Sequence, residues 1–131
     1  MKTPFQMVRE FHEAFLVPVQ DSPGFPDIER RKLRQRLLWE EYREYVQAED
    51  ADDFIELADA LADMVYIIAG TAVEYGINLD AVFAEVHRSN MAKLGPDGKP
   101  IHRADGKVIK PEGWKAPDIA MALGIGKGDP Q

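Results

Sequence analysis

The sequence contains no cysteine, which excludes disulfide bonds, thiolate metal sites and cysteine nucleophiles. It has no apolar run approaching the roughly 20 residues that cross a bilayer. The first residues lead into a charged helix instead of an apolar signal segment, so we expect a cytoplasmic protein without a membrane partner. At 131 residues the chain is expected to form one domain with a proper core.

Positive charge and histidine are both scarce. The formal net charge of -7 argues against nucleic acid as an electrostatic partner, although an acidic protein can still bind phosphate compounds through metal ions. A dinuclear iron bundle needs Glu-x-x-His pairs, and no glutamate precedes any of the three histidines by three residues. A zinc hydrolase lacks the spaced histidines that it requires.

Helical periodicity and capping signals dominate the first 95 residues. Thr3 and Gln6 form a capping box before a short helix. Asp27 caps a second helix that runs to about Ala48, and its candidate buried positions are Leu33, Leu37, Leu38, Tyr45 and Val46. A third helix spans about 54–75 and ends at Gly76, and a fourth spans about 79–94, capped by Asn78. Short connections predict an all-α, antiparallel four-helix bundle over residues 1–95.

The character of the sequence changes after Gly95. Two short alternating runs flank Asp105-Gly106, a typical two-residue hairpin turn, and the last residues, "GIGKGDPQ", are expected to be loose. We therefore expect residues 96–131 to form a small β-hairpin and tail of the same domain. Residues 27–63 carry 12 acidic and 6 basic side chains, whereas residues 87–115 carry 7 basic and 3 acidic ones. A metal site beside an anion clamp would have this charge distribution, and so would two solvated faces.

Two helices carry acidic stripes among apolar residues. In "LLWEEYREYV" the glutamates Glu40, Glu41 and Glu44 share one side of the second helix with Leu37. On the third helix the spacing of three and four places Glu56, Asp59 and Asp63 on one face. Because a short connection makes these helices antiparallel neighbours, up to six carboxylates are expected to meet.

A carboxylate cluster needs compensation, because two unit charges 4 Å apart repel by about 4 kcal/mol at an effective dielectric constant near 20. Magnesium prefers oxygen ligands and bridges carboxylates to phosphates, and manganese would also fit. The alternative is a set of ordinary surface carboxylates paired with Arg34, Arg36 and Arg43. For three glutamates plus a second acidic stripe, the metal site is the favoured interpretation.

These residues carry a resemblance to a known family. Glu40-Glu41-x-x-Glu44 with the following acidic stripe resembles the metal-binding signature of the MazG-like all-α NTP pyrophosphatases. "ALADMVYIIAGTAVEYGINLDAVFAEVHRSNMAKL" is similar to the branch of dUTPase-related bacterial enzymes, and the likeness covers most of residues 5–118. The resemblance implies magnesium-dependent hydrolysis of a nucleoside triphosphate to monophosphate and pyrophosphate, on a dimeric or tetrameric scaffold.

The resemblance does not decide which aspartate of the third helix binds the metal. The family motif ends in Glu-x-x-Asp, which Glu56 and Asp59 satisfy literally. In the family the aspartate usually precedes a run that resembles Met64-Val65-Tyr66-Ile67. This position corresponds to Asp63, and Ala60 then stands where the motif has its glutamate. We therefore expect Asp59 and Asp63 as ligands, with Glu56 as a further ligand or a supporting group.

Four further polar residues are candidate substrate contacts. Asn90 and Lys93 match positions that contact the nucleotide in relatives, although a polar helix end would look the same. Lys107 and Lys110 on the expected hairpin would hold phosphates, as would Arg103, and a solvated hairpin face is an equal alternative. Trp39, Tyr42 and Tyr66 are expected to be core or interface residues. Extra aromatic residues and a projecting hairpin in such a short chain favour a homodimer.

The sequence supports three alternative hypotheses about function. The first is a pyrophosphohydrolase in which magnesium binds the triphosphate and Glu41 or Glu44 helps to deprotonate the attacking water. By resemblance its substrate would be dUTP-like and its role nucleotide-pool house-cleaning. The second is a phosphoribosyl-ATP pyrophosphohydrolase or a hydrolase of another modified nucleotide. The third is a helical interaction module without enzymatic activity.

Overall fold

The structure, a computed structural model, describes residues 1–126, and the predicted all-α fold is confirmed. No β-strand forms within these residues. A short C-terminal helix was not predicted. The helices, in chain order, are α1 (Pro4–Ala14), α2 (Ile28–Asp50), α3 (Phe54–Tyr75), α4 (Leu79–Met91) and the short α5 (Ile119–Ala122). No helix of the described part is long and apolar enough to cross a membrane.

The predicted capping residues of the first three helices lie at the expected helix ends. Thr3 Oγ1 accepts the Gln6 N–H at 3.1 Å, and Gln6 Oε1 accepts the Thr3 N–H at 2.9 Å, which completes the capping box. Asp27 accepts the Arg30 N–H at 3.0 Å at the start of α2. Gly76 ends α3 in the left-handed conformation, with a φ of 69°.

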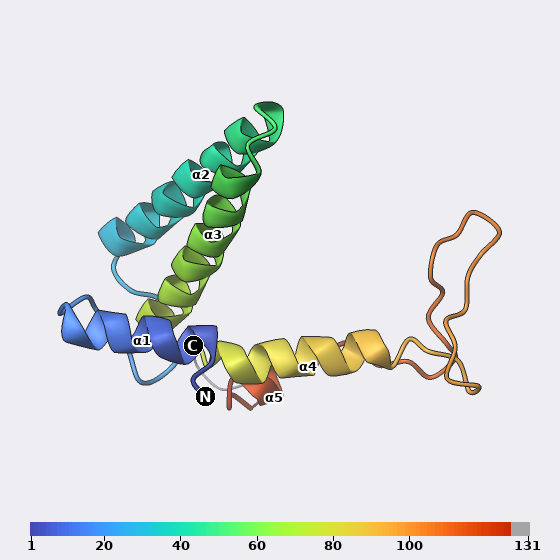
Figure 1. Cartoon of the computed structure of the whole chain (residues 1–131). Coiled ribbons are helices and arrows are strands. Elements are labelled where there is room, and N and C mark those ends of the chain that lie inside the picture. Colours follow the sequence, from blue (N-terminus) through green and yellow to red (C-terminus); the bar gives the residue numbers. More distant parts are fainter. Residues whose placement is uncertain (127–131) are drawn as a thin grey trace. The chain divides into compact units, whose positions relative to one another are not determined.

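The chain forms two compact units, residues 1–79 and the part that follows from Asp80. In the first unit α2 and α3 lie side by side as antiparallel neighbours, and α1 packs against α3 (Figure 1). Small side chains such as Ala60, Ala69 and Ala72 are buried on α3, where they permit a close approach of the neighbouring helices.

The contact side of α2 differs from the expected apolar stripe. The predicted core positions of α2 are only half-buried: Leu33, Leu37, Leu38, Tyr45 and Val46. Its fully buried residues are Arg34 and Ala48 instead. Polar and charged groups therefore occupy part of the contact between α2 and α3.

The loop between α1 and α2 is attached to the C-terminal end of α3. Backbone N–H groups of Gln20 and Gly24 donate to the carbonyls of Val73 and Tyr75 at 3.1 and 3.0 Å. A side chain at Gly76 would place its Cβ 2.0 Å from the Ser22 carbonyl oxygen. The close approach of this loop therefore requires glycine at that position.

The second unit contains α4, a long connection and α5. Helix α4 ends at Met91, three residues before the predicted end. The predicted hairpin is reduced to two isolated antiparallel bridges, Leu94 with Pro100 and His102 with Val108. Its turn is a three-residue loop, 104–106, closed by a 2.8 Å hydrogen bond from the Arg103 N–H to the Lys107 carbonyl.

The C-terminal tail and the division of the chain into a bundle and a tail stay predictions. Most of the expected loose tail, residues 127–131, lies outside the described residues. The grouping of residues 1–95 into one helical bundle, with 96–131 as a tail of the same domain, also stays a prediction.

Candidate metal centre

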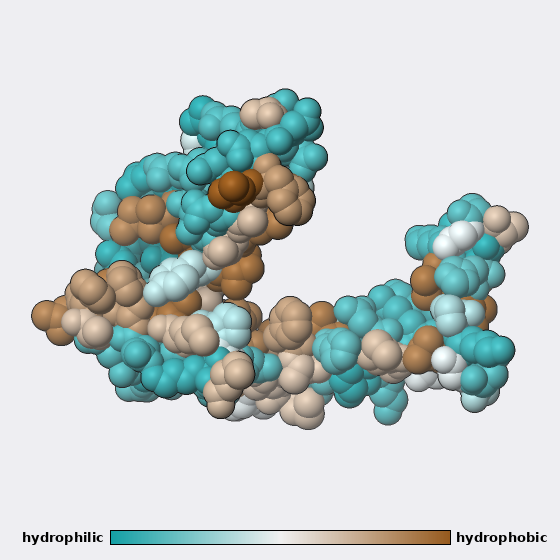
Figure 2. All heavy atoms as spheres, in the orientation of Figure 1, coloured by the Kyte–Doolittle hydropathy of each residue, from teal (hydrophilic) through white to brown (hydrophobic). Residues whose placement is uncertain are grey.

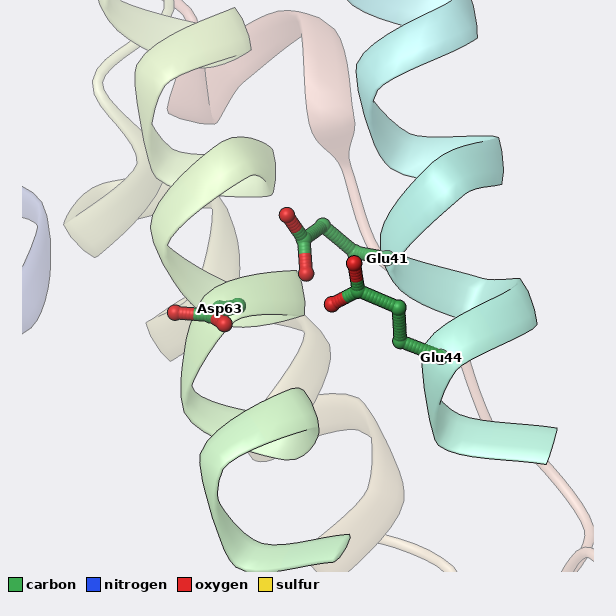
Figure 3. Close-up of side chains that lie close together, drawn as sticks. All are labelled: Glu41, Glu44 and Asp63. Atoms are coloured by element: carbon green, nitrogen blue, oxygen red, sulfur yellow. The ribbon is translucent and has the colours of Figure 1, made fainter. Parts of the chain in front are cut away.

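Three of the predicted carboxylates meet between α2 and α3. Glu41 and Glu44 extend from α2 toward α3, where Asp63 lies (Figure 3). One carboxylate oxygen from each of the three residues lies within 4.8 Å of those of the other two. Glu41 and Asp63 are half-buried and Glu44 is exposed, so the cluster is open on one side.

The Glu41 carboxylate is held in an unfavourable environment. Its Oε2 is buried and has no hydrogen-bond partner within the described residues. Burial raises the pKa of Glu41 from 4.5 to about 7, together with a hydrogen bond shared with Glu44 and the charge of Glu44. The charges of Asp63 and Asp59 add to this rise in the pKa of Glu41.

The same surroundings affect Asp63. Burial raises the pKa of Asp63 above its ordinary value, and the negative charges of Asp59 and Glu44 raise it further. A hydrogen bond with Glu41 partly offsets this rise. The cluster therefore concentrates negative charge that protons or a cation must compensate.

No basic side chain supplies this compensation among residues 1–126. None of the ion pairs found there includes a member of the cluster, Glu41, Glu44 or Asp63. Two arginines that were candidate partners are engaged elsewhere: Arg34 pairs with Glu74, and Arg43 lies over the Trp39 ring at 4.9 Å. The interpretation as ordinary paired surface carboxylates loses these two partners.

The remaining predicted ligands lie outside the three-residue group. Asp59 is exposed one turn before Asp63, close enough for its charge to act on the cluster. Glu40 is exposed on α2, and Glu56 is exposed in the first turn of α3, where its N–H donates to Asp53 at 3.1 Å. The structure brings together three of the six predicted carboxylates, with a fourth nearby.

The predicted substrate-binding residues belong to the second unit. Lys93 Nζ donates to Asn90 Oδ1 at 3.0 Å. The ammonium groups of Lys93 and Lys110 lie over the Trp114 ring, 5.6 and 4.5 Å from its centroid. Lys107 is exposed at the turn, and its N–H donates to Asp105 at 3.1 Å. Trp114 thus gathers two of the predicted lysines, a role that the sequence did not reveal.

Sequence reasoning also missed a buried ion-pair network in the first unit. Glu74 is 2% exposed in the last turn of α3, and Arg34 of α2 is 6% exposed. The available signal was a single carboxylate in the run 69–75, which has no other charged residue. A lone acidic residue in such a run is expected to be buried with a partner.

The donor set fits a hard divalent cation. All three clustered groups are carboxylates, which magnesium and manganese prefer, and the partnerless Glu41 Oε2 is an oxygen that a cation would satisfy. The fold and these residues together define an all-α protein whose antiparallel helix pair assembles a carboxylate cluster suited to a metal ion.

Comparison with known proteins identifies the family. The family model described as phosphoribosyl-ATP pyrophosphohydrolase matches residues 8–90, which is more than half of the chain. The chain therefore belongs to this family, which is part of the MazG-like all-α NTP pyrophosphohydrolase superfamily. Membership supports a pyrophosphohydrolase-like chemistry on a nucleotide.

A viral protein is also similar. Over 102 residues the chain is 30% identical to the "Uncharacterized protein L479" of Acanthamoeba polyphaga mimivirus. This likeness covers 75% of the present chain and 38% of the viral protein. The chain thus spans about two fifths of the length of that relative, whose description names no activity.

Proposed function

We propose that this protein is a magnesium-dependent nucleoside triphosphate pyrophosphohydrolase. The observation that carries this proposal is the convergence of Glu41, Glu44 and Asp63, with one buried oxygen that has no partner, in a chain of a pyrophosphohydrolase family. Glu41, Glu44 and Asp63 would hold the metal, with Asp59 beside them. Glu40 and Glu56 are proposed as supporting groups. Manganese is the expected substitute for magnesium.

A bound divalent cation would neutralise polyphosphate oxygens and lower the pKa of a coordinated water. In the proposed reaction, Glu41 or Glu44 accepts a proton from the water that attacks the α-phosphorus. The bond between the α-phosphorus and the bridging oxygen breaks, and pyrophosphate leaves. The products are a nucleoside monophosphate and pyrophosphate, with one water consumed.

The second unit supplies the proposed substrate contacts. Asn90 and Lys93 are joined by a hydrogen bond. The ammonium groups of Lys93 and Lys110 both lie over the Trp114 ring. Lys107 is exposed and carries a further positive charge. We assign these side chains to the nucleotide and its leaving pyrophosphate.

The preferred substrate is proposed to be dUTP-like, by resemblance to the dUTPase-related branch, with a house-cleaning role in the cytoplasm. The second candidate substrate is phosphoribosyl-ATP, which the match to that family over residues 8–90 favours. Both reactions release pyrophosphate from a phosphoanhydride, so the carboxylate cluster serves either one.

We also propose a homodimer, with a tetramer as the alternative. A groove of about 390 Å³ between α2 and α3 is lined by Gln35, Leu38, Trp39, Tyr42, Met64 and Ile68. Trp39 and Tyr42 are 57% and 50% exposed. Hydrophobic residues are visible on the surface of the helices in the space-filling view (Figure 2). Such exposed apolar surface is typical of an interface.

The test is pyrophosphate release from a panel of nucleotides that includes dUTP, other dNTPs, NTPs and phosphoribosyl-ATP, with and without magnesium. Glu41→Gln is expected to lower kcat/KM by about 100-fold or more, because a metal ligand and candidate base is lost. The matched control is Glu49→Gln, the same change at an exposed position of α2, which is expected to keep full activity. A helical interaction module would release no pyrophosphate from any substrate and would be insensitive to both changes.

A further inference from the structure

A buried ion-pair network joins α2 to α3. The Glu74 side chain is 0% exposed and receives a bidentate contact from Arg30, with Nε at 2.8 Å and Nη2 at 2.9 Å. Arg34 Nη1 donates to the same carboxylate at 2.9 Å. Two guanidinium groups from successive turns of α2 thus bind one carboxylate of α3.

Arg34 is held by more than its charge partner. Its Nη2 donates to the Ile67 carbonyl at 2.9 Å, and its Nε donates to Thr71 Oγ1 at 3.1 Å. Gly70 makes room for the guanidinium, because a Cβ there would lie 2.5 Å from Nη2. Contacts to the backbone and side chains of α3 therefore place Arg34 at one position along that helix.

The network and the carboxylate cluster share one helix register. Glu41 follows Arg30 by 11 residues on α2, and Asp63 precedes Glu74 by 11 residues on α3. Since α2 and α3 are antiparallel, the register that sets Arg30 opposite Glu74 also sets Glu41 opposite Asp63. Both spacings are about three helical turns, so both pairs lie on the contact side.

Apolar contacts alone specify this register weakly. Leu37 and Leu38 of α2 are only half-buried. Half-buried side chains constrain a slide of one helix along the other less than closely interlocked core side chains do. A bidentate guanidinium–carboxylate contact is directional and is lost after the same slide. Replacing a buried ion pair by apolar residues is often neutral or stabilising, so setting the register is the best-attested reason for such a pair.

We propose that Arg30, Arg34 and Glu74 are positioning residues that set the register of α2 against α3 and thereby align Glu41 with Asp63. The link to metal binding rests on the proposed function, whereas the link to helix register does not. None of the three side chains belongs to the clustered carboxylates, so they act on the site only through the helices.

The absence of cysteine allows a direct measurement of the register. Spin labels at introduced cysteines, Arg36→Cys on α2 and Ala58→Cys on α3, both exposed, report the distance between the helices along their axes. These sites are staggered along the helix pair, so a slide by one turn, about 5.4 Å, changes their separation by several ångströms. Double electron–electron resonance measures this distance in the full chain.

The decisive variant is Arg34→Met with Glu74→Met. It removes the ion pair and fills the space between α2 and α3 with apolar side chains. We expect it to fold, with a label distance that shifts or broadens. The matched control is Val8→Ala, which empties buried space on α1 and leaves the seam between α2 and α3 intact. It lowers the melting temperature but is expected to keep the wild-type distance.

The second readout is Mn²⁺ affinity, measured without labels from the electron paramagnetic resonance signal of the free ion. We expect the double methionine variant to bind Mn²⁺ about 10-fold or more weakly, as changes in supporting residues typically do. The Val8→Ala control is expected to bind as wild type does. Either an unchanged label distance or an unchanged Mn²⁺ affinity in the double variant overturns the proposal.

Two further outcomes are a wild-type protein that binds no Mn²⁺ and a double variant that does not fold. If wild type binds no Mn²⁺, the proposed metal site is wrong, and the label distance alone decides whether the network sets the register. If the double variant does not fold, Arg30→Gln takes its place, because the Arg30 side chain is 28% exposed and its loss leaves Arg34 with Glu74. A single, unshifted distance in that variant would overturn the proposal, because Arg30 makes the bidentate contact with Glu74.

Discussion

At the scale of single residues, Glu41 has the most unusual surroundings in the described chain. It is a half-buried carboxylate with a partnerless oxygen, and it lies beside Glu44 and Asp63. Its sequence context, an acidic pair next to apolar residues, predicted a compensated charge. The context did not predict that Glu41 and Glu44 would converge with Asp63 while Glu40 stays exposed.

The raised pKa of Glu41 predicts a pH dependence of stability in the absence of divalent ions. The folded protein retains the Glu41 proton up to about pH 7, whereas the unfolded chain releases it near 4.5. The folded state then binds more protons, so the free energy of unfolding falls as the pH rises through this window. Asp63, whose pKa is also raised, acts in the same direction.

Urea unfolding between pH 4.5 and 8 in the presence of a chelator measures this effect. Glu41→Gln removes the titrating group and is expected to flatten the profile, while Glu49→Gln is expected to leave it unchanged. Magnesium is expected to restore stability at the alkaline end of the wild-type profile, because a cation replaces the proton. A wild-type profile that rises between pH 5 and 7 would contradict the assignment.

At the scale of helices and loops, the end of α3 and the loop before α2 depend on one glycine. Gly76 has a φ of 69°, and any Cβ there would meet the Ser22 carbonyl oxygen at 2.0 Å. The sequence predicted the helix end from this glycine. It did not predict the loop packed against it, because the contact joins residues 54 positions apart.

We therefore predict that Gly76→Ala detaches this loop. The expected result is faster amide hydrogen exchange at Gln20 and Gly24, whose N–H groups donate to carbonyls at the end of α3. The expected loss of stability is about 1–3 kcal/mol from the steric clash, in addition to the cost of the left-handed conformation. Urea unfolding measures this loss.

The matched control is Gly98→Ala. Gly98 has a similar φ of 74°, but nothing lies within 4 Å of the Cβ that the change would add. It is expected to show the conformational cost alone, about 1–2 kcal/mol, with no change in exchange at Gln20 and Gly24. Equal exchange rates in both variants would show that the loop does not depend on the close approach at Gly76.

At the scale of the whole molecule, the exposed apolar groove predicts self-association. Trp39→Glu places a charge in the groove and is expected to shift the protein from dimer toward monomer in sedimentation experiments. Arg36→Glu is the control, because it changes the charge of an exposed residue of α2 outside the groove lining. A wild-type protein that sediments as a monomer at every concentration would contradict the proposed dimer.

The sequence by itself determined the all-α class, the capping of the first helices and the acidic stripes. These features follow from local periodicity and from side chains that bond to backbone groups three residues away. The tertiary structure alone decided which carboxylates meet, and that Arg34 pairs with Glu74 instead of a surface acid. Such contacts depend on the register between two helices, which no local pattern encodes, because several registers present the same apolar stripe.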